Sequence, residues 1–124
     1  MTQWNDDELT RIGSAEELEI AALRPDGTSR GRVTIWVVPH GDGVYVRSVN
    51  GRGAAWFRGT QATHRGRVWA GGVEKDVTFV DAGDGMDDEL DAAYRRKYAR
   101  YPASIVDSIL TPQARSTTIK LVPA

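Results

Sequence analysis

"RVTIWVVPHGDGVYVRSV", Arg32 to Val49, is the stretch from which the predicted fold follows. Arg32 to Val38 alternates β-branched and aromatic residues, which predicts a strand, and both faces of that strand are apolar. The sequence HGDG that follows is typical of a hairpin turn, and Val44 to Val49 is predicted to be the return strand. Because a strand that is apolar on both faces has to be covered on both, we expect a helix or a second subunit over it.

Further short strands are predicted outside this hairpin, separated by turns that hold most of the 13 glycines. Glu17 to Arg24, the first of these segments, suits a helix as well as a strand, because its apolar residues fit both the helical and the strand period. These segments are Glu17 to Arg24, Arg65 to Ala70, Val73 to Asp81, and Ser116 to Val122. This order predicts a mainly β, α+β domain, and closing its antiparallel sheet into a small barrel would remove the exposed edges.

Helices are predicted at the start and near the end of the chain. Asn5 is a good N-cap for a short helix that Gly13 would stop. The main helix is predicted over Met86 to Arg100, with one or two more turns over Ser104 to Leu110. A stripe at helical spacing runs through Leu90, Tyr94, Tyr98 and Tyr101. Acidic residues open this helix and basic residues close it, as the helix dipole prefers, so a core helix is favoured over a basic nucleic-acid patch.

Length and composition narrow the class of protein. The 124 residues predict a single domain over 1–124, and the absence of cysteine excludes disulfides and thiolate chemistry. The net charge of −1 argues against nucleic-acid or membrane-surface binding. No apolar run has the length of a membrane helix, and the acidic N-terminus is unlike a signal peptide, so we expect a cytoplasmic protein. The two histidines and the acidic run after residue 80 fit no metal-site pattern.

"NGRGAAWFRG", Asn50 to Gly59, is the stretch that points to a ligand. Its glycines permit a loop whose successive amides could bind an anion. Arg47, Arg52 and Arg32 would add guanidinium groups that suit phosphate oxygens. A structural interpretation stands beside this one: Arg47 pairs with an acid such as Asp42, and the tryptophan in the loop plugs the end of the barrel. The residues alone leave both interpretations open.

The sequence resembles the domain of unknown function 2255 family over nearly its whole length. The segments that carry the resemblance are "DGTSRGRVTIWVV", "DGVYVRSVNGRGAAWFRG", "GRVWAGGVEKDVTF", "DAAYRRKY" and the final "TIKLVP". More distantly the chain is similar to the flavin-binding split-barrel superfamily, which includes pyridoxamine-phosphate-oxidase-like proteins and deazaflavin-dependent nitroreductases. That resemblance implies a six-stranded antiparallel split β-barrel, often dimeric, with a cofactor at the barrel edge or the subunit interface.

The resemblance also implies which residues would hold a cofactor. Its phosphate would be held from two neighbouring strands and the loop between them, its ring would lie along one strand, and a tryptophan would close the pocket. The matching positions are Arg32, Thr34, Trp36, Arg47, Ser48, Arg52 and Trp56. Ala55 stands where the nitroreductases usually have a proline, which is a departure from their loop pattern.

The sequence therefore predicts a homodimeric, flavin- or deazaflavin-binding oxidoreductase, with FMN or coenzyme F420 as cofactor. Hydride chemistry belongs to such a cofactor, so no dedicated acid or base is required, and Tyr45 and His64 are the candidates. The alternative is a split barrel without cofactor that binds a small ligand or a protein partner. That alternative predicts no flavin affinity and an internal salt bridge at Arg47.

Overall fold

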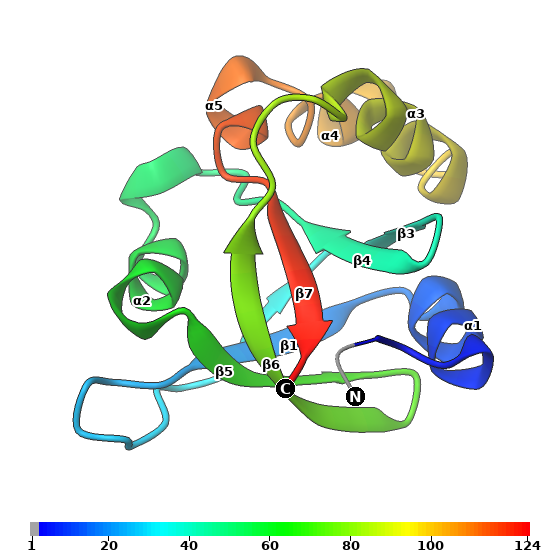
Figure 1. Ribbon diagram of the computed structural model, residues 1–124. Coiled ribbons are helices and arrows are strands. Elements are labelled where there is room, and N and C mark those ends of the chain that lie inside the picture. Colours follow the sequence, from blue (N-terminus) through cyan, green and yellow to red (C-terminus); the bar gives the residue numbers. More distant parts are fainter. Residues whose placement is uncertain (1–2) are drawn as a thin grey trace.

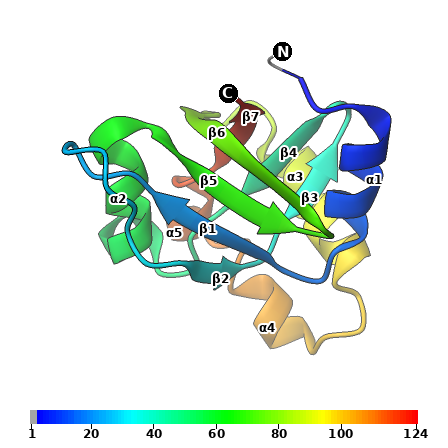
Figure 2. The same cartoon turned by 90° about the horizontal axis from the view of Figure 1, so that it is seen from below.

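The computed structural model describes residues 3–124. Its strands are β1 (Leu18–Ala22), β2 (Val33–Ile35), β3 (Val38–His40), β4 (Gly43–Val46), β5 (Arg65–Ala70), β6 (Val73–Asp81) and β7 (Ile119–Pro123). They form a curled 7-stranded antiparallel sheet in the order β2-β1-β5-β6-β7-β4-β3 (Figures 1 and 2). The predicted α+β split barrel is confirmed, with seven strands instead of six.

The extra strand arises because the segment predicted as one strand, Arg32 to Val38, is broken at Trp36 and Val37. β2 pairs with β1, whereas β3 pairs with β4, and these pairings lie at opposite ends of the sheet. Because two residues connect the two edge strands, the sheet has to curl until its edges approach each other. Pro39 is compatible with β3 because an edge strand tolerates a missing backbone donor.

Both faces of this broken strand are covered where it crosses the gap. Val37 is buried in the barrel core, and its neighbour Val38 is buried in a second core outside the barrel. Trp36 packs against that second core as well. The predicted cover is therefore present here, and it is provided by helices of the same chain. β2 itself is more open, since Val33 keeps 36% of its surface exposed.

The second core lies under helices α3 (Asp87–Lys97), α4 (Ala103–Asp107) and α5 (Pro112–Arg115), which Figure 1 shows above the β3–β4 hairpin. The predicted tyrosine stripe is confirmed as core, with Tyr94 and Tyr98 fully buried and Tyr101 partly buried. The acidic first turn and basic last turn of α3 are also present. α5 was not predicted; Thr111 caps its first turn, and a proline follows that cap.

Helix α1 (Asp6–Ser14) closes the opposite end of the barrel, where it packs against β3, β4 and β6 (Figure 1). It begins at Asn5 with a reciprocal capping box, as predicted. The expectation that Gly13 stops the helix is wrong, because the helix continues to Ser14. Gly13 instead lies against β3, where an added Cβ would come within 3.0 Å of Pro39 Cγ.

The loop after β4 leads into the short helix η1 (Gly51–Gly53) and then into helix α2 (Ala55–Thr63) on the side of the barrel (Figure 1). β4 is shorter than predicted and ends at Val46, so Arg47 and Ser48 lie beyond it. α2 ends at Thr63, and its C-cap residue, His64, adopts a left-handed conformation with φ 58°. Within residues 3–124, no helix has the length and hydrophobicity needed to span a membrane.

Candidate functional site

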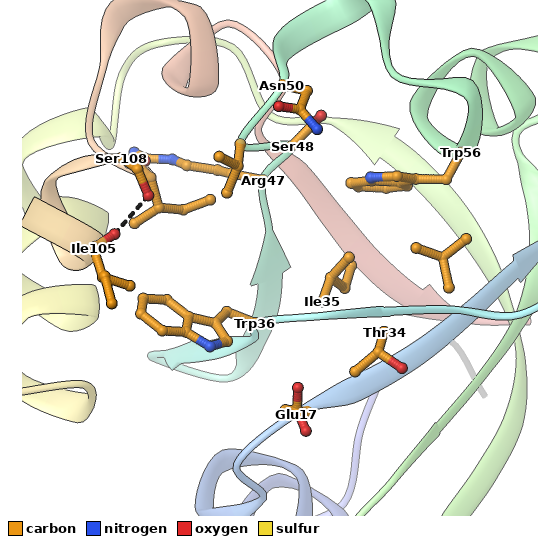
Figure 3. A pocket seen from close by; sticks show the side chains of 13 residues that line it. Glu17, Thr34, Ile35, Trp36, Arg47, Ser48, Asn50, Trp56, Ile105 and Ser108 are labelled. Carbon is orange, nitrogen blue, oxygen red and sulfur yellow. Dashed lines mark hydrogen bonds between the residues drawn. The ribbon is translucent and has the colours of Figure 1, made fainter. Parts of the chain in front are cut away.

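A cavity of about 400 Å³ lies where the two edges of the sheet approach each other (Figure 3). It is bounded by β2, the segment after β4, the start of α2, and α4. Its lining residues are Glu17, Val33, Thr34, Ile35, Trp36, Arg47, Ser48, Val49, Asn50, Trp56, Ile105, Ser108 and Ile109. Five of the seven residues predicted to bind a cofactor are therefore brought together here: Thr34, Trp36, Arg47, Ser48 and Trp56.

Trp36 forms one wall of the cavity and is held there by Tyr98. The two rings are stacked with their centroids 3.8 Å apart and their planes inclined by 4°. The Tyr98 hydroxyl accepts from the Val37 amide at 3.1 Å and donates to the Glu16 carbonyl at 2.9 Å. Burial raises the pKa of Tyr98, so the hydroxyl stays protonated. The indole is thus fixed by a stacked ring whose own position is hydrogen-bonded.

Trp56 lies across the cavity from Trp36, as Figure 3 shows. It stands at the beginning of α2 and is half-buried, whereas the next residue, Phe57, is buried in the barrel core. The barrel core is also closed by Trp4, whose indole N–H donates to the Leu121 carbonyl at 2.9 Å. Trp56 also packs against the barrel core, so it contacts that core and lines the cavity at the same time.

Ser48 contributes an unpaired hydroxyl to the cavity wall. The residue is 1% exposed, and its Oγ has no hydrogen-bond partner among the described residues. Its backbone amide, in contrast, donates to the Thr117 hydroxyl at 2.7 Å, which holds the segment in place. A buried polar group without a partner costs about 1–3 kcal/mol, so such groups call for an explanation.

Arg47 lines the cavity, but its guanidinium group is already paired with other residues of the protein. It is 1% exposed, and its Nη1 lies 2.6 Å from Asp91 Oδ1. Its Nε donates to the Thr118 hydroxyl at 3.1 Å, and its Nη2 lies 3.6 Å from Asp87 Oδ1. The acid partner suggested from the sequence, Asp42, is wrong, because Asp91 comes from a helix that packs over this end of β4.

Asp91 is a full carboxylate that bridges two arginines. Its second oxygen accepts from Arg115, at 3.1 Å from Nε and with a further contact to Nη2. Burial alone would raise the pKa of Asp91, but the hydrogen bonds from Arg115 and Arg47 outweigh burial and hold that pKa below its ordinary value. The positive charge of Arg47 is therefore balanced inside the protein.

The other two arginines of the predicted clamp lie away from the cavity. The Arg32 guanidinium lies 3.8 Å from the centre of the Trp69 ring and 3.8 Å from Glu19. Arg52 donates to the Ser116 carbonyl at 2.8 Å. The structure therefore does not gather the three predicted guanidinium groups around one anion.

A second cavity of about 210 Å³ adjoins the first and shares Trp56 and Val33 with it. Arg24 and Arg30 line it, and the buried Nε of Arg30 has no hydrogen-bond partner among the described residues. Arg30 comes from the turn between β1 and β2, and sequence reasoning missed it. The signal that could have found it is the run of arginines in "RPDGTSRGR", residues 24–32.

Sequence reasoning also missed the contribution of α4 to the first cavity, where Ile105 and Ser108 form one side (Figure 3). These residues lie more than forty positions after the end of the Asn50 to Gly59 loop and match no motif. The candidate acid and base lie elsewhere. Tyr45 is buried with its hydroxyl 3.8 Å from Met86 Sδ, and His64 caps α2 at 3.8 Å from Asp81. Residues 3–124 contain no group of three or more side chains suited to a metal ion.

The geometry fits a flat, uncharged ring better than a free anion. Two indoles, Ile35 and Ile105 provide apolar walls, Ser48 provides a hydroxyl, and Asn50 provides an amide at the edge. Pockets of this volume, with apolar walls and a few placed polar groups, are typical of small-molecule sites. The anion-binding character that the sequence predicted for this point is reduced by the Arg47–Asp91 pair.

Comparisons with solved structures place the chain among split-barrel proteins. It is similar to the heme storage protein HutZ from Vibrio cholerae, with 12% identity, a TM-score of 0.69, and coverage of 96% of this chain and 89% of the other. It is also similar to an F420 reductase, with 15% identity, a TM-score of 0.54, and coverage of 92% and 89%. A third is a FAD-binding protein from Mesorhizobium loti, with 16% identity, a TM-score of 0.55, and coverage of 98% and 89%. At these identities the similarity establishes the fold alone.

A comparison with curated proteins found no significant match. The family described as "Uncharacterized protein conserved in bacteria (DUF2255)" matches over residues 8–121, which is most of the chain. The resemblance first drawn from the sequence segments is thereby confirmed, and the chain belongs to the DUF2255 family.

Proposed function

We propose that the chain binds the flat ring of a flavin-type cofactor, FMN or coenzyme F420, in the cavity between Trp36 and Trp56, and that it serves as an oxidoreductase. The observation that carries the proposal is an apolar cavity between two indoles whose lining includes Ser48, with the Ser48 hydroxyl buried and without a partner among the described residues. A heteroatom of a bound ring would satisfy that hydroxyl. The split-barrel structures to which this chain is similar include proteins described as FAD-binding and as an F420 reductase.

The chemistry in this proposal is divided between cofactor and protein. A bound flavin or deazaflavin would supply hydride transfer. The protein would hold the ring between two indoles, exclude water from one of its faces, and place Ser48 at a ring heteroatom. Among the described residues, Glu17 and Arg47 are the titratable side chains in the lining of the cavity.

The phosphate end of the cofactor would lie in the adjoining cavity. The unpaired Nε of Arg30 supports this placement, since the three arginines predicted for the clamp already have partners. Trp56 and Val33 are shared by both cavities, so one elongated ligand could pass along them. Charge-assisted hydrogen bonds from arginine to phosphate are stronger than neutral ones, which makes Arg30 the main contributor at that end.

A second copy of the chain is proposed as the cover of the cavity mouth. Val33, Val49 and Ile105 line the cavity and are 36%, 49% and 47% exposed. Large apolar side chains gathered around one opening favour a contact surface. Sedimentation at several protein concentrations tests this proposal: we expect a dimer, and a monomer at high concentration would contradict it.

The test of cofactor binding is a titration of cofactor-free protein with FMN and with the deazaflavin, followed by ligand fluorescence. We expect saturable binding in the micromolar range or tighter for one of them. Trp56→Leu should weaken binding about tenfold or more, because stacking on an aromatic ring is lost. Trp69→Leu is the matched control, since Trp69 lies under Arg32 outside the cavity. Equal losses in both variants would contradict the proposed site.

The second candidate function is a binding module without cofactor. The buried Arg47–Asp91 ion pair favours it, because this alternative predicted an internal salt bridge at Arg47. The same titration separates the two candidates. Absence of binding by either cofactor at high concentration would support the module, and the cavity would then belong to another small ligand or to a protein side chain.

A further inference from the structure

We infer that Asp91 is a specificity-determining residue for the cavity. By balancing the charge of Arg47 it makes the cavity a site for an uncharged ring, and it leaves the anionic end of the ligand to Arg30 next door. The inference deepens the proposed function and rests on it. It names the ligand class as a neutral planar ring joined to a chain that ends in an anion, and it predicts one orientation of that ligand.

The charge behind the cavity wall is not positive in total. Two cations, Arg47 and Arg115, face three carboxylates of α3: Asp87, Asp88 and Asp91. Asp91 lies between the cations, with one oxygen 2.6 Å from Arg47 and the other accepting from Arg115. An anion entering the cavity would have to compete with a buried carboxylate that already holds the best positions on Arg47. The cavity therefore gains little from a ligand's negative charge.

The arrangement at Arg30 is the opposite. Among residues 3–124, its Nε is buried without a hydrogen-bond partner, and no carboxylate lines the cavity that Arg30 shares with Arg24. Arg24 donates to Thr28 and to the Ser29 carbonyl, and its nearby acid, Asp26, does not line this cavity. An anion at this place would meet cations whose charge is available. The two adjoining cavities thus differ in charge although they share Trp56, and this difference sets which end of a ligand enters which cavity.

The test compares the affinities of FMN and riboflavin, which have the same ring and differ in the phosphate. The ratio of the two affinities is the readout, because damage to the fold weakens both ligands alike and leaves the ratio unchanged. We expect the unaltered protein to prefer FMN, and Arg30→Gln to reduce that preference toward equality. Arg47→Met should leave the preference as it is. A fall in the ratio with Arg47→Met would overturn the inference.

Asp91→Asn supplies the decisive comparison. It frees Arg47, so the ratio of FMN to riboflavin affinity should rise about tenfold as the arginine becomes available to an anion. Asp88→Asn is the matched control: it removes one charge from the same helix, but Asp88 is fully exposed and lies 3.8 Å from Arg115. An Asp91→Asn ratio equal to that of the control would overturn the inference. If Asp91→Asn does not fold, the affinity ratios of Arg30→Gln and Arg47→Met still test the inference.

A separate probe distinguishes failure of the inference from failure of the proposed function. Inorganic phosphate is added while the indole N–H signals of Trp36 and Trp56 are followed by NMR. We expect saturable shifts at Trp36 in Asp91→Asn and none in the unaltered protein. If no flavin binds but these shifts appear, the proposed cofactor is wrong and the role of Asp91 stands. If shifts at Trp36 are equal in both proteins, the role of Asp91 is wrong whatever the cofactor.

Discussion

The ring of Trp36 lies parallel to the ring of Tyr98, 3.8 Å from centroid to centroid, although 61 residues separate them. This stack joins the wall of the candidate site to helix α3. The Tyr98 hydroxyl also accepts a hydrogen bond from the amide of Val37, which lies at the break between β2 and β3. One tyrosine therefore holds both the indole and the backbone turn that closes the barrel.

Tyr98→Phe and Tyr98→Leu separate these two roles. Tyr98→Phe keeps the stack and leaves the Val37 amide without its partner, so we expect it to lower the free energy of unfolding by about 1–3 kcal/mol. Tyr98→Leu also removes the stacked ring, which adds about 0.5–1.5 kcal/mol. Urea unfolding measures the stability, and ligand titration measures the site. Ring affinity should fall clearly with leucine and little with phenylalanine; equal affinity in both variants would show that the stack does not support the site.

The Arg47–Asp91 pair predicts a strong non-additivity. Asp91→Leu should destabilise the protein by about 3–5 kcal/mol, because it leaves the buried charge of Arg47 without its main partner. Arg47→Met should cost less, since Asp91 keeps its contact with Arg115. The double variant should recover most of the Asp91→Leu loss, since both charges are then gone. Urea unfolding of the four proteins gives the coupling energy. Additive losses would mean that the two charges are not paired in solution.

The sequence predicted the strand segments well but missed the break that shapes the barrel. Alternation over Arg32 to Val38 is a local signal, and its prediction of one strand is correct for Val33 to Ile35 and for Val38 but not for the two residues between them. That β2 pairs with β1 while β3 pairs with β4 depends on partners elsewhere in the chain. Local patterns carry no information on which edge a strand joins, so the break at Trp36 and Val37 could not be predicted.

The sequence predicted several of the residues that line the candidate site, but it did not predict that the charge of Arg47 is balanced there. The aromatic walls could be predicted from residue type, since Trp36 and Trp56 are large flat side chains that suit the wall of a ring-binding site. The state of Arg47 depends on Asp91, 44 positions away in the sequence. Any of the 17 acidic residues was an equal candidate on sequence grounds. The interpretation of α3 as core succeeded because its stripe is a property of one helix.

Lys97 predicts a rise of stability with pH. Its ammonium donates to the Val37 carbonyl at 2.7 Å, and burial lowers the pKa of Lys97 to about 8, although the charge of Glu16 acts to raise it. Above that pH the folded chain has lost a proton that the unfolded chain keeps, so unfolding takes up a proton and its free energy increases with pH.

The measurement is urea unfolding in steps from pH 7 to about 9.5, below the ordinary pKa of tyrosine near 10. This limit matters because burial raises the pKa of Tyr94 and Tyr98, and these groups lower stability at higher pH. Lys97→Met should remove the rise. A rise of the same size in Lys97→Met would assign it to another group.

Gly51 and Gly53 form a matched pair in the loop before α2. Gly51 has φ +73°, and a side chain there would meet Gln113 Cγ at 2.3 Å. Gly53 has open space around it and no positive φ. Gly51→Ala should therefore lower the free energy of unfolding by about 1–3 kcal/mol through backbone strain, whereas Gly53→Ala should be neutral or slightly stabilising. Thermal unfolding of both variants is the measurement, and similar melting temperatures would contradict the loop geometry.

Ser48→Ala should change stability and binding in opposite directions. In the absence of ligand the buried Oγ has no partner among the described residues, so its removal should leave stability unchanged or raise it by about 1 kcal/mol. Binding of the ring should weaken about tenfold, because the hydroxyl is expected to meet a ring heteroatom there. Thermal unfolding without ligand and titration with ligand give the two values. Thr117→Val is the contrasting variant: it removes the hydroxyl that accepts from the Ser48 amide at 2.7 Å, and it should lower both stability and affinity. A loss of stability without ligand in Ser48→Ala would mean that the hydroxyl serves the fold, and the strongest support for a ligand in this cavity would be gone.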